Sequence, residues 1–454
     1  MRGQPNPRAL TSAPVHTLFS RHLGGRAVPA LLSALLAFAG LSVSGAAVAD
    51  VGTIAHDSLR TGWDNNEAAL SPSAVGSSNF GKLFSTAVDG QVYAQPLVVG
   101  GTVIAATENN NVYGLDGVTG AKKWTRNLGP AWPAATVSCG DLTPNIGITS
   151  TPVFDAATNS VFLMAKTNDG PSPQLPHWYM HSLDRTTGAE RAGFPVLIGG
   201  APTNDPSRPF NAMTAMQRPG LLLLNGVVYA GFASHCDYVP FVGYVVGVST
   251  SGQQTTMWAT ESGNSNAEGG IWQSGGGLVS DGPGQILLTT GNGISPKAGP
   301  GTTPPKTLAE SVVRLQVGTD GNLKPTDFFS PANNIKLDQN DADLGSGAPV
   351  GIPDGYGTAQ HPHLLTQVGK DGHVYLLDRD HLGGMGQGTG GTDDVLDAAG
   401  PYNGVWGRPA FLGTSNGGYI YTVENRGYLR AHKIVPSVTG GIKLASVGTS
   451  AGTF

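Results

Sequence analysis

A regular succession of short apolar runs and Gly/Asn turns in residues 91–124 constrains the fold more than any other feature of this chain. The segment contains three runs of strand length, at 91–99, 102–107 and 112–116. Turns rich in Gly and Asn separate the runs, as they do in β-hairpins. Because strands joined by such short turns pair with their neighbours, the segment predicts an antiparallel meander that closes at Trp124.

The same pattern recurs along the chain. Further copies open near residues 147, 217, 275, 343 and 405. The prolines of the first strands lie roughly 55–70 residues apart, a long period that leaves room for loop insertions. Six repeats of this kind predict an all-β fold, a β-propeller of four-stranded antiparallel blades. The Gly-rich stretch 383–388 is expected to be a flexible loop between the fifth and sixth repeats.

A generic β-sandwich is the alternative fold, because any β-rich protein needs Gly-rich turns. Composition favours turn-dense β-structure over helices in either case, since Gly accounts for 67 of 454 residues and charged residues for only 13%. The ordered recurrence of strand, proline, strand and turn favours the propeller.

Residues 114–124, GLDGVTGAKKW, resemble the A-x-D-x-x-T-G-x-x-x-W signature of PQQ-like (quinoprotein-type) propeller repeats. In that family the Trp docks between adjacent blades, and the Asp and Thr-Gly fix the turn beneath it. The resemblance therefore assigns blade docking to Asp116, Thr119, Gly120 and Trp124. It implies that Trp124 is buried between two blades.

The resemblance extends over most of the chain from about residue 80, and propellers of this family usually carry seven or eight blades. Six repeats therefore predict an incomplete ring with a gap between the first and last blades. Residues 80–88, FGKLFSTAV, are interpreted as the outer strand of the closing blade without its inner partners. Either the sequence is a fragment, or a partner chain is expected to fill the gap.

The N-terminus has the features of a Sec-type signal peptide. Residues 1–49 combine several arginines, an apolar run at 28–43 and the small-x-small sequence Ala47-Val48-Ala49. We expect export to the periplasm or the exterior, a mature start near Asp50, an N-terminal extension over 50–79 and the propeller over 80–454. An uncleaved anchor is the alternative.

The chain has two cysteines, Cys139 and Cys236. An even count in an exported protein predicts a disulfide between them, and two separate thiols are the alternative. The net charge is −5 and no basic run follows residue 49, which argues against nucleic acid as a partner. No further apolar run of membrane-spanning length exists in the sequence.

Ligands of propellers usually bind near one mouth of the axial channel. Side chains just before the first strand of each blade are therefore the candidate site residues: Gln95, Ser150, Arg218, Gln273, Asp343, Ser346 and Arg408. Two Arg, one carboxylate and several amides suit a small polar or anionic ligand. The alternative is that these groups bind channel water and one another.

Quinoprotein dehydrogenases of this fold hold the quinone against a disulfide between adjacent cysteines, coordinate Ca²⁺ with a Glu and an Asn, and use an Asp as base. This chain lacks adjacent cysteines and a matching Glu/Asn/Asp set. No catalytic residue is therefore assigned, and PQQ with Ca²⁺ stays an alternative cofactor. The carboxylates available for a cation are Asp338, Asp341 and Asp343.

Three functions follow from these observations. The first is an exported binding or scaffolding module, with a small polar molecule or a glycan as ligand and a degenerate quinone site. The second is a PQQ-dependent sugar or alcohol dehydrogenase with a divergent active site. The third is a protein that binds or hydrolyses cell-wall polysaccharide.

Overall fold

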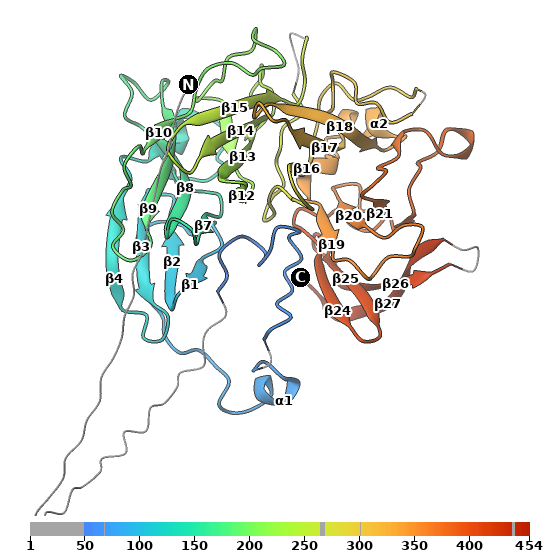
Figure 1. Ribbon diagram of the computed structural model, residues 1–454, viewed down its shortest axis with the longest axis horizontal. Helices are drawn as coiled ribbons and strands as arrows, with labels where there is room; N and C mark the ends of the chain where they lie inside the picture. Colours follow the sequence, from blue (N-terminus) through green and yellow to red (C-terminus); the bar gives the residue numbers. More distant parts are fainter. Residues whose placement is uncertain (1–49, 68, 264–267, 300, 438–440) are drawn as a thin grey trace, which may run out of the picture. The chain divides into compact units, whose positions relative to one another are not determined.

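The computed structural model describes residues 50–454, apart from 68, 264–267, 300 and 438–440. In this part of the chain, six sheets of four or five strands follow one another along the sequence, beside one two-stranded sheet (Figure 1). The predicted propeller of four-stranded blades is therefore confirmed. The predicted signal peptide, 1–49, lies outside the described residues.

We number the sheets as blades 1 to 6. Blades 1 to 3 contain β1 (Leu97–Val99), β2 (Thr102–Ala106), β3 (Asn111–Asp116), β4 (Lys122–Asn127); β7 (Val153–Asp155), β8 (Ser160–Thr167), β9 (His177–Asp184), β10 (Val196–Leu197); and β11 (Ala215–Gln217), β12 (Leu222–Leu224), β13 (Val227–Ser234), β14 (Tyr244–Ser249), β15 (Gln254–Ala259). Blades 4 to 6 contain β16 (Gln285–Thr289), β17 (Val312–Val317), β18 (Leu323–Ser330), β22 (Gly384–Met385); β19 (Val350–Ile352), β20 (Leu364–Val368), β21 (Val374–Asp378), β23 (Asp397–Ala399); and β24 (Ala410–Thr414), β25 (Gly417–Val423), β26 (Tyr428–Pro436), β27 (Ile442–Thr453).

The remaining elements are short. They are β5 (Trp132–Pro133), β6 (Asn145–Ile146), α1 (Pro72–Val75), α2 (Asn334–Gln339) and three single 3₁₀ turns at Ala134–Thr136, Leu344–Ser346 and Thr389–Gly391. Within the described residues, no helix has the length and apolar character needed to cross a membrane.

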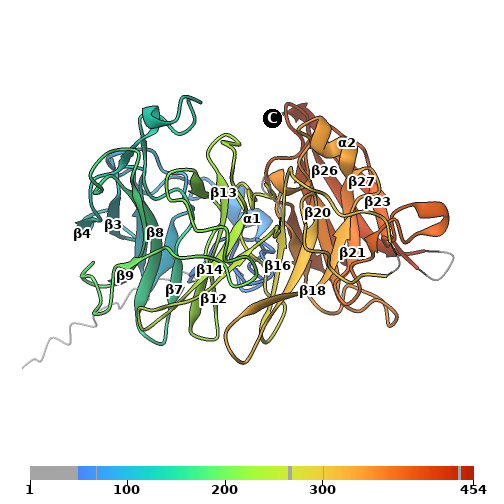
Figure 2. The ribbon, with the colours of Figure 1, turned by 90° about the horizontal axis from the view of Figure 1, so that it is seen from above.

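The hydrophobic core lies between the blades. Five clusters of buried side chains each join two consecutive blades, from blades 1 and 2 to blades 5 and 6. Figure 2 shows the sheets side by side in this order. No such cluster and no strand pairing joins blade 6 to blade 1 in the described part of the chain. Consecutive blades therefore pack against each other at five interfaces.

The Gly-rich stretch after the third strand of blade 5 corrects a prediction. Residues 383–388 were expected to form a flexible loop, but Gly384–Met385 is a strand, β22, that pairs in parallel with β18 of blade 4. Met385 is 8% exposed and joins the cluster between blades 3 and 4. The chain thus returns from blade 5 to complete blade 4 before it forms β23, an exchange that local sequence pattern does not reveal.

The blade-docking turn has the expected geometry. The Asp116 carboxylate accepts the Val118 and Thr119 N–H groups at 3.1 and 2.9 Å and the Thr119 hydroxyl at 2.9 Å. Gly120 follows with a φ of +71°, a conformation that favours glycine. The same three hydrogen bonds recur in blade 2 at Asp184. The turn is therefore a repeated structural device.

Trp124 lies between blades 1 and 2, as the resemblance implied. Its Nε1–H donates to the carbonyl of Arg185 in blade 2 at 3.1 Å, and its ring lies against Gly188 of the same turn. Trp124 is only partly buried, which corrects the expectation of full burial. One edge of the ring faces solvent because the outer strand β4 is otherwise exposed.

Residues 80–88 do not form a strand, which corrects their interpretation as one. Their position nevertheless matches an outer strand, since Phe84 packs on Gly120 of blade 1 and the Thr86 hydroxyl donates to the Gly120 carbonyl at 2.7 Å. Strand geometry requires a hydrogen-bonded partner, and the described residues offer none here.

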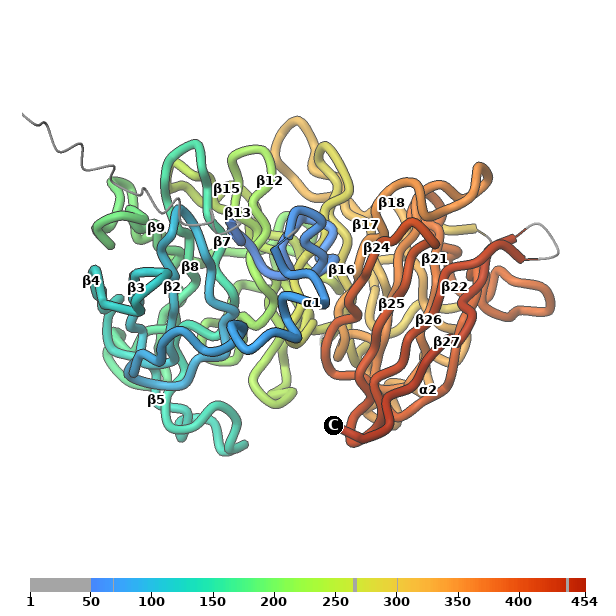
Figure 3. The backbone as a smooth tube through the Cα atoms, turned by 90° about the horizontal axis from the view of Figure 1, so that it is seen from below, coloured from blue at the N-terminus to red at the C-terminus, as the bar shows by residue number. Residues whose placement is uncertain are grey.

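The N-terminal segment 51–63, blue in Figure 3, forms hydrogen bonds with residues in or beside the inner strands of the six blades. Its backbone pairs with Val98 of blade 1, accepts the N–H groups of residues in blades 2, 4, 5 and 6 (Phe154, Ser280, Gly351 and Phe411), and reaches blade 3 through the Arg60 side chain, which donates to Leu221. Because no strand pairing joins blades 1 and 6 among the described residues, this segment, which leads along the chain into blade 1, links the two blades through hydrogen bonds.

Arg60 is the centre of that segment. It is fully buried, and its guanidinium donates to the carbonyls of Leu278, Leu221, Ile54 and Asp57 and to the Thr53 hydroxyl. Burial lowers the pKa of Arg60 to about 10. Hydrogen bonds to five acceptors offset the cost of burying the charge.

Candidate functional site

Three of the predicted site residues come together in one pocket. Arg218, Asp343 and Ser346 line a cavity of about 240 Å³. Asp343 and Ser346 precede β19, the first strand of blade 5, whereas Arg218 lies between β11 and β12 of blade 3. The other lining residues are Asp141, Cys236, Asp237, Trp272, Ser274, Lys370 and Trp406. The N-terminal segment instead contacts residues within the inner strands. The pocket and the segment therefore lie at different parts of the blades.

The other four predicted residues do not line this pocket. Gln95 accepts the N–H of Ala55 at 3.1 Å, and Arg408 donates to the carbonyl of Arg60 at 3.4 Å, so both hold the N-terminal segment. Gln273 is fully buried and bonds within its own blade, to Gly277 and Thr289. Ser150 is buried, and its hydroxyl has no hydrogen-bond partner among the described residues. The roles of Gln95 and Arg408 could not be predicted, because nothing in the sequence indicates that residues 51–63 contact the inner strands.

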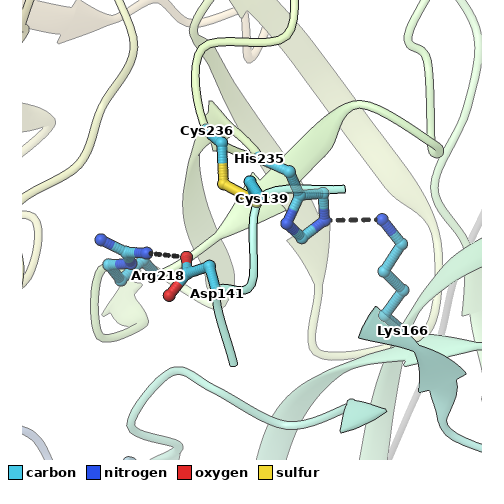
Figure 4. Close-up of a disulfide and its surroundings, with 6 residues drawn as sticks. All are labelled: Cys139, Asp141, Lys166, Arg218, His235 and Cys236. Atoms are coloured by element: carbon cyan, nitrogen blue, oxygen red, sulfur yellow. Dashed lines mark hydrogen bonds and ion pairs between the residues drawn. A yellow bond between two sulfur atoms is a disulfide. The ribbon is translucent and has the colours of Figure 1, made fainter. Parts of the chain in front are cut away.

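Arg218 forms one charged wall of the pocket. Its guanidinium lies 2.9 Å from the Asp141 carboxylate and 5.4 Å from the centre of the Trp272 ring. The predicted disulfide between Cys139 and Cys236 is present, and it places the chain of Asp141 beside the Cys236 loop (Figure 4). The disulfide therefore fixes two loops of the pocket wall.

Lys370 forms the second charged wall. Its ammonium lies 2.6 Å from Asp341 and also contacts Asp343. Burial opposes its charged form, but the two carboxylates outweigh burial and raise the pKa of Lys370. The Asp343 carboxylate also accepts the Asn292 N–H at 2.8 Å. Both cations of the pocket are thus already paired.

The carboxylates considered for Ca²⁺ have other partners. Asp338 accepts the Gly293 N–H at 2.9 Å, while Asp341 and Asp343 bind Lys370. Within the described residues no group of three or more His, Cys, Asp or Glu side chains is placed to hold a metal ion.

Asp237 is the carboxylate without a partner. No hydrogen bond or ion pair reaches it from the described residues, and its backbone has a φ of +50°. Its outer side is open to solvent, yet burial of its inner side and the carboxylates of Asp343 and Asp341 raise its pKa to about 6. The strained backbone next to the disulfide is a feature often found at binding sites.

The pocket does not fit a quinone tricarboxylate. Its lining carries three carboxylates (Asp141, Asp237 and Asp343) against two cations, both of them paired. A polyanion would meet surplus negative charge without a compensating metal. The disulfide joins cysteines 97 residues apart, unlike the adjacent pair of the dehydrogenases. We therefore derive no reaction step through this cofactor.

A buried Lys–His pair lies behind the pocket wall, and sequence reasoning did not find it. Lys166 Nζ is 2.8 Å from His235 Nε2 and 3.7 Å from the centre of the Trp132 ring, as Figure 4 shows for Lys166 and His235. Burial lowers the pKa of Lys166 well below its usual range and that of His235 to about 2. Burial thus disfavours the charged form of both side chains, and the full burial of the pair keeps it from ligands.

Two buried glutamates, also not anticipated, connect blades. Glu108 accepts the Gly147 N–H of blade 2 at 2.6 Å, and Glu310 accepts the Leu344 N–H at the start of blade 5 at 2.7 Å. Burial raises the pKa of Glu108 to about 7 and that of Glu310 to about 9. Neither lines the pocket, so we assign both to blade packing.

A larger recess, of about 840 Å³, lies between the loops of blades 2 and 3. It is lined mainly by apolar and aromatic groups such as Phe210, Met213 and Tyr244, and its single charged side chain, Arg208, lies 3.6 Å from Asp205. The recess has volume but few convergent polar groups, so the smaller pocket is the better candidate for specific binding.

Comparison with known proteins agrees with this fold. Residues 78–169 match the profile of a PQQ-repeat family described as outer membrane protein assembly factor BamB. No curated protein sequence matches the chain. A solved quinohemoprotein alcohol dehydrogenase from Comamonas testosteroni is 16% identical, with a TM-score of 0.55, over 85% of this chain and 59% of that protein.

Two further solved structures are similar more loosely. A quinohemoprotein alcohol dehydrogenase from Pseudomonas putida is 16% identical, with a TM-score of 0.48, over 78% of this chain and 53% of its own. BamB from Moraxella catarrhalis is 14% identical, with a TM-score of 0.40, over 75% of this chain and 71% of that protein.

The fold is a β-propeller, and its first two blades share the same Asp-Thr-Gly turn. Residues 78–169 match the PQQ-repeat profile, and the likeness to the Comamonas structure extends to the propeller fold. It spans 59% of the length of the Comamonas dehydrogenase, so that protein's activity is not transferred with the fold.

Proposed function

We propose that this protein is an exported binding module whose ligand site is the pocket before the inner strands, and that its quinone site is degenerate. The observation that carries the proposal is the charge arrangement of the pocket. Arg218 and Lys370 are both neutralised by carboxylates, and Asp237 remains unpaired. Convergent polar groups and two Trp side chains suit recognition of a small polar molecule.

The disulfide supports export, because disulfides persist in oxidising compartments and are rare in the cytosol. The 43% exposure of Trp406 at the pocket supports a sugar as one ligand, since sugar rings stack on exposed aromatic faces. A paired set of carboxylic acids for hydrolysis has no support in the pocket, where Asp141 and Asp343 are committed to ion pairs.

A quinone-dependent dehydrogenase is the second candidate, and the overall fold shared with the Comamonas enzyme favours it. The two proposals are separated by titrating purified protein with PQQ in the presence of Ca²⁺ and following the intrinsic tryptophan fluorescence, to which Trp272 and Trp406 of the pocket contribute. The binding-module proposal expects no saturable quenching. Saturable quenching that disappears in an Arg218→Ala variant would favour the dehydrogenase.

A further inference from the structure

We propose that the pocket recognises an organic ammonium ion, a protonated amine carried on a small polar scaffold such as an amino sugar. The inference deepens the proposed binding function and rests on it. Three independent features of the pocket support it: the unpaired carboxylate, the surplus of negative charge around that carboxylate, and the two Trp rings.

The unpaired carboxylate gives the ammonium group its partner. Asp237 follows Cys236 on a loop fixed by the disulfide, and both residues have left-handed backbone conformations. The other two carboxylates of the lining, Asp141 and Asp343, already bind Arg218 and Lys370. An added cation can therefore pair with Asp237 without breaking an existing ion pair.

The charge around Asp237 excludes an anion. The electrostatic influence of Asp343 and Asp341 on Asp237 exceeds that of Lys370 and Arg218. Burial, and next the negative charge of Asp237, also raise the pKa of Glu268. A positive ligand beside Asp237 would offset this effect of the neighbouring carboxylates.

The Trp rings add a surface that cations prefer. Arg218 already lies over the face of Trp272 at 5.4 Å, which shows that a ring face in this pocket attracts a cation. Trp406 is 43% exposed and has no cation or ring stacked on it among the described residues. The carbon skeleton of a ligand can stack on the face of Trp406 while its ammonium group binds a carboxylate.

The test uses three probes with one sugar ring and different charges: glucosamine, glucose and glucuronate. Isothermal titration of the whole mature protein at pH 7 should rank glucosamine at least about tenfold tighter than glucose, and glucuronate weakest. Asp237→Asn should weaken glucosamine about tenfold and leave glucose unchanged. Asp394→Asn, an exposed carboxylate outside the pocket, is the matched control and should change neither.

The pH dependence gives a second readout that needs no variant. Glucosamine affinity should fall as the pH is lowered through about 6, where the Asp237 carboxyl takes up its proton. Trp406→Leu, checked for folding by circular dichroism, should also weaken glucosamine. Equal binding of glucose, or tighter binding of glucuronate, would overturn the ammonium assignment and leave the binding module standing. Absence of binding by all three probes would overturn both.

Discussion

The ring of Phe84 lies directly on the backbone of Gly120, so that a Cβ at residue 120 would overlap it. Trp124 lies on Gly188 in the same manner one blade further along. The segment 80–88 therefore docks on blade 1 as β4 docks on blade 2, although it forms no strand. An outer segment can thus dock on the turn of the following blade without forming a strand itself.

Gly120→Ala should destabilise the protein by about 2–3 kcal/mol, because the new methyl group meets Phe84 and Thr86 as well as a φ of +71°. Gly101→Ala is the matched control, with a φ of +68° and open space around the added Cβ. The control should lower the free energy of unfolding by about 1 kcal/mol, because only the strain of the left-handed backbone opposes the methyl group. Urea denaturation measures both, and equal losses would contradict the docking interpretation.

Trp124→Ala should cost about 2–3 kcal/mol, below the usual loss for a fully buried Trp, because the ring is only partly buried. The variant also leaves the Arg185 carbonyl without its indole donor. The midpoint of thermal unfolding is the readout. An unchanged midpoint would show that the ring does not hold blades 1 and 2 together.

Arg60→Met should be more damaging than any variant of an exposed arginine. It removes donors to four carbonyls that bind blades 3 and 4 and the N-terminal segment itself. We expect a loss of at least about 3 kcal/mol in the free energy of unfolding. Arg126→Met, on the exposed strand β4, should change it by less than about 0.5 kcal/mol. Similar losses in the two variants would refute the role of Arg60 as a link.

Lys166→Met should flatten the dependence of stability on pH. Burial lowers the pKa of Lys166 in the folded state, so between that value and its unfolded value of 10.5 the unfolded chain binds more protons. Stability of the wild type therefore rises with pH in this window. Guanidinium denaturation at pH 7, 8.5 and 10 should show a smaller slope in the variant. An identical slope would indicate that Lys166 is charged when folded.

Loss of the disulfide should weaken both the fold and the pocket. A Cys139→Ser/Cys236→Ser double variant should lose about 2–5 kcal/mol, since the bond closes a loop of 97 residues. Asp141 and Asp237 lie close to these cysteines in sequence, so glucosamine binding should weaken as well. Unchanged binding in a folded double variant would separate the disulfide from the site.

The propeller could be predicted from sequence because each blade repeats a local pattern. The turn at Asp116 could also be predicted, because residues 114–124 resemble a known repeat signature, and the disulfide could be predicted from the count of two cysteines. The sequence did not predict that β22 joins blade 4, nor the path of residues 51–63. Both depend on contacts between segments that are distant in sequence.

The candidate site was predictable only in part for the same reason. Arg218, Asp343 and Ser346 precede inner strands and meet in the pocket, as their positions suggested. Gln95 and Arg408 occupy comparable positions but bind the N-terminal segment. Lys370 and Asp237 follow second strands, and no local motif marks them. Their role emerges only when neighbouring blades bring their charges together.

The most direct test of the account is turnover with the cofactor supplied. Purified mature protein is incubated with PQQ and Ca²⁺, and reduction of an electron-accepting dye is followed with primary alcohols and aldoses. A binding module whose pocket repels polyanions predicts dye reduction no faster than in the protein-free blank. Reduction that saturates with PQQ, depends on the alcohol or aldose, and is lost in Arg218→Ala would contradict it.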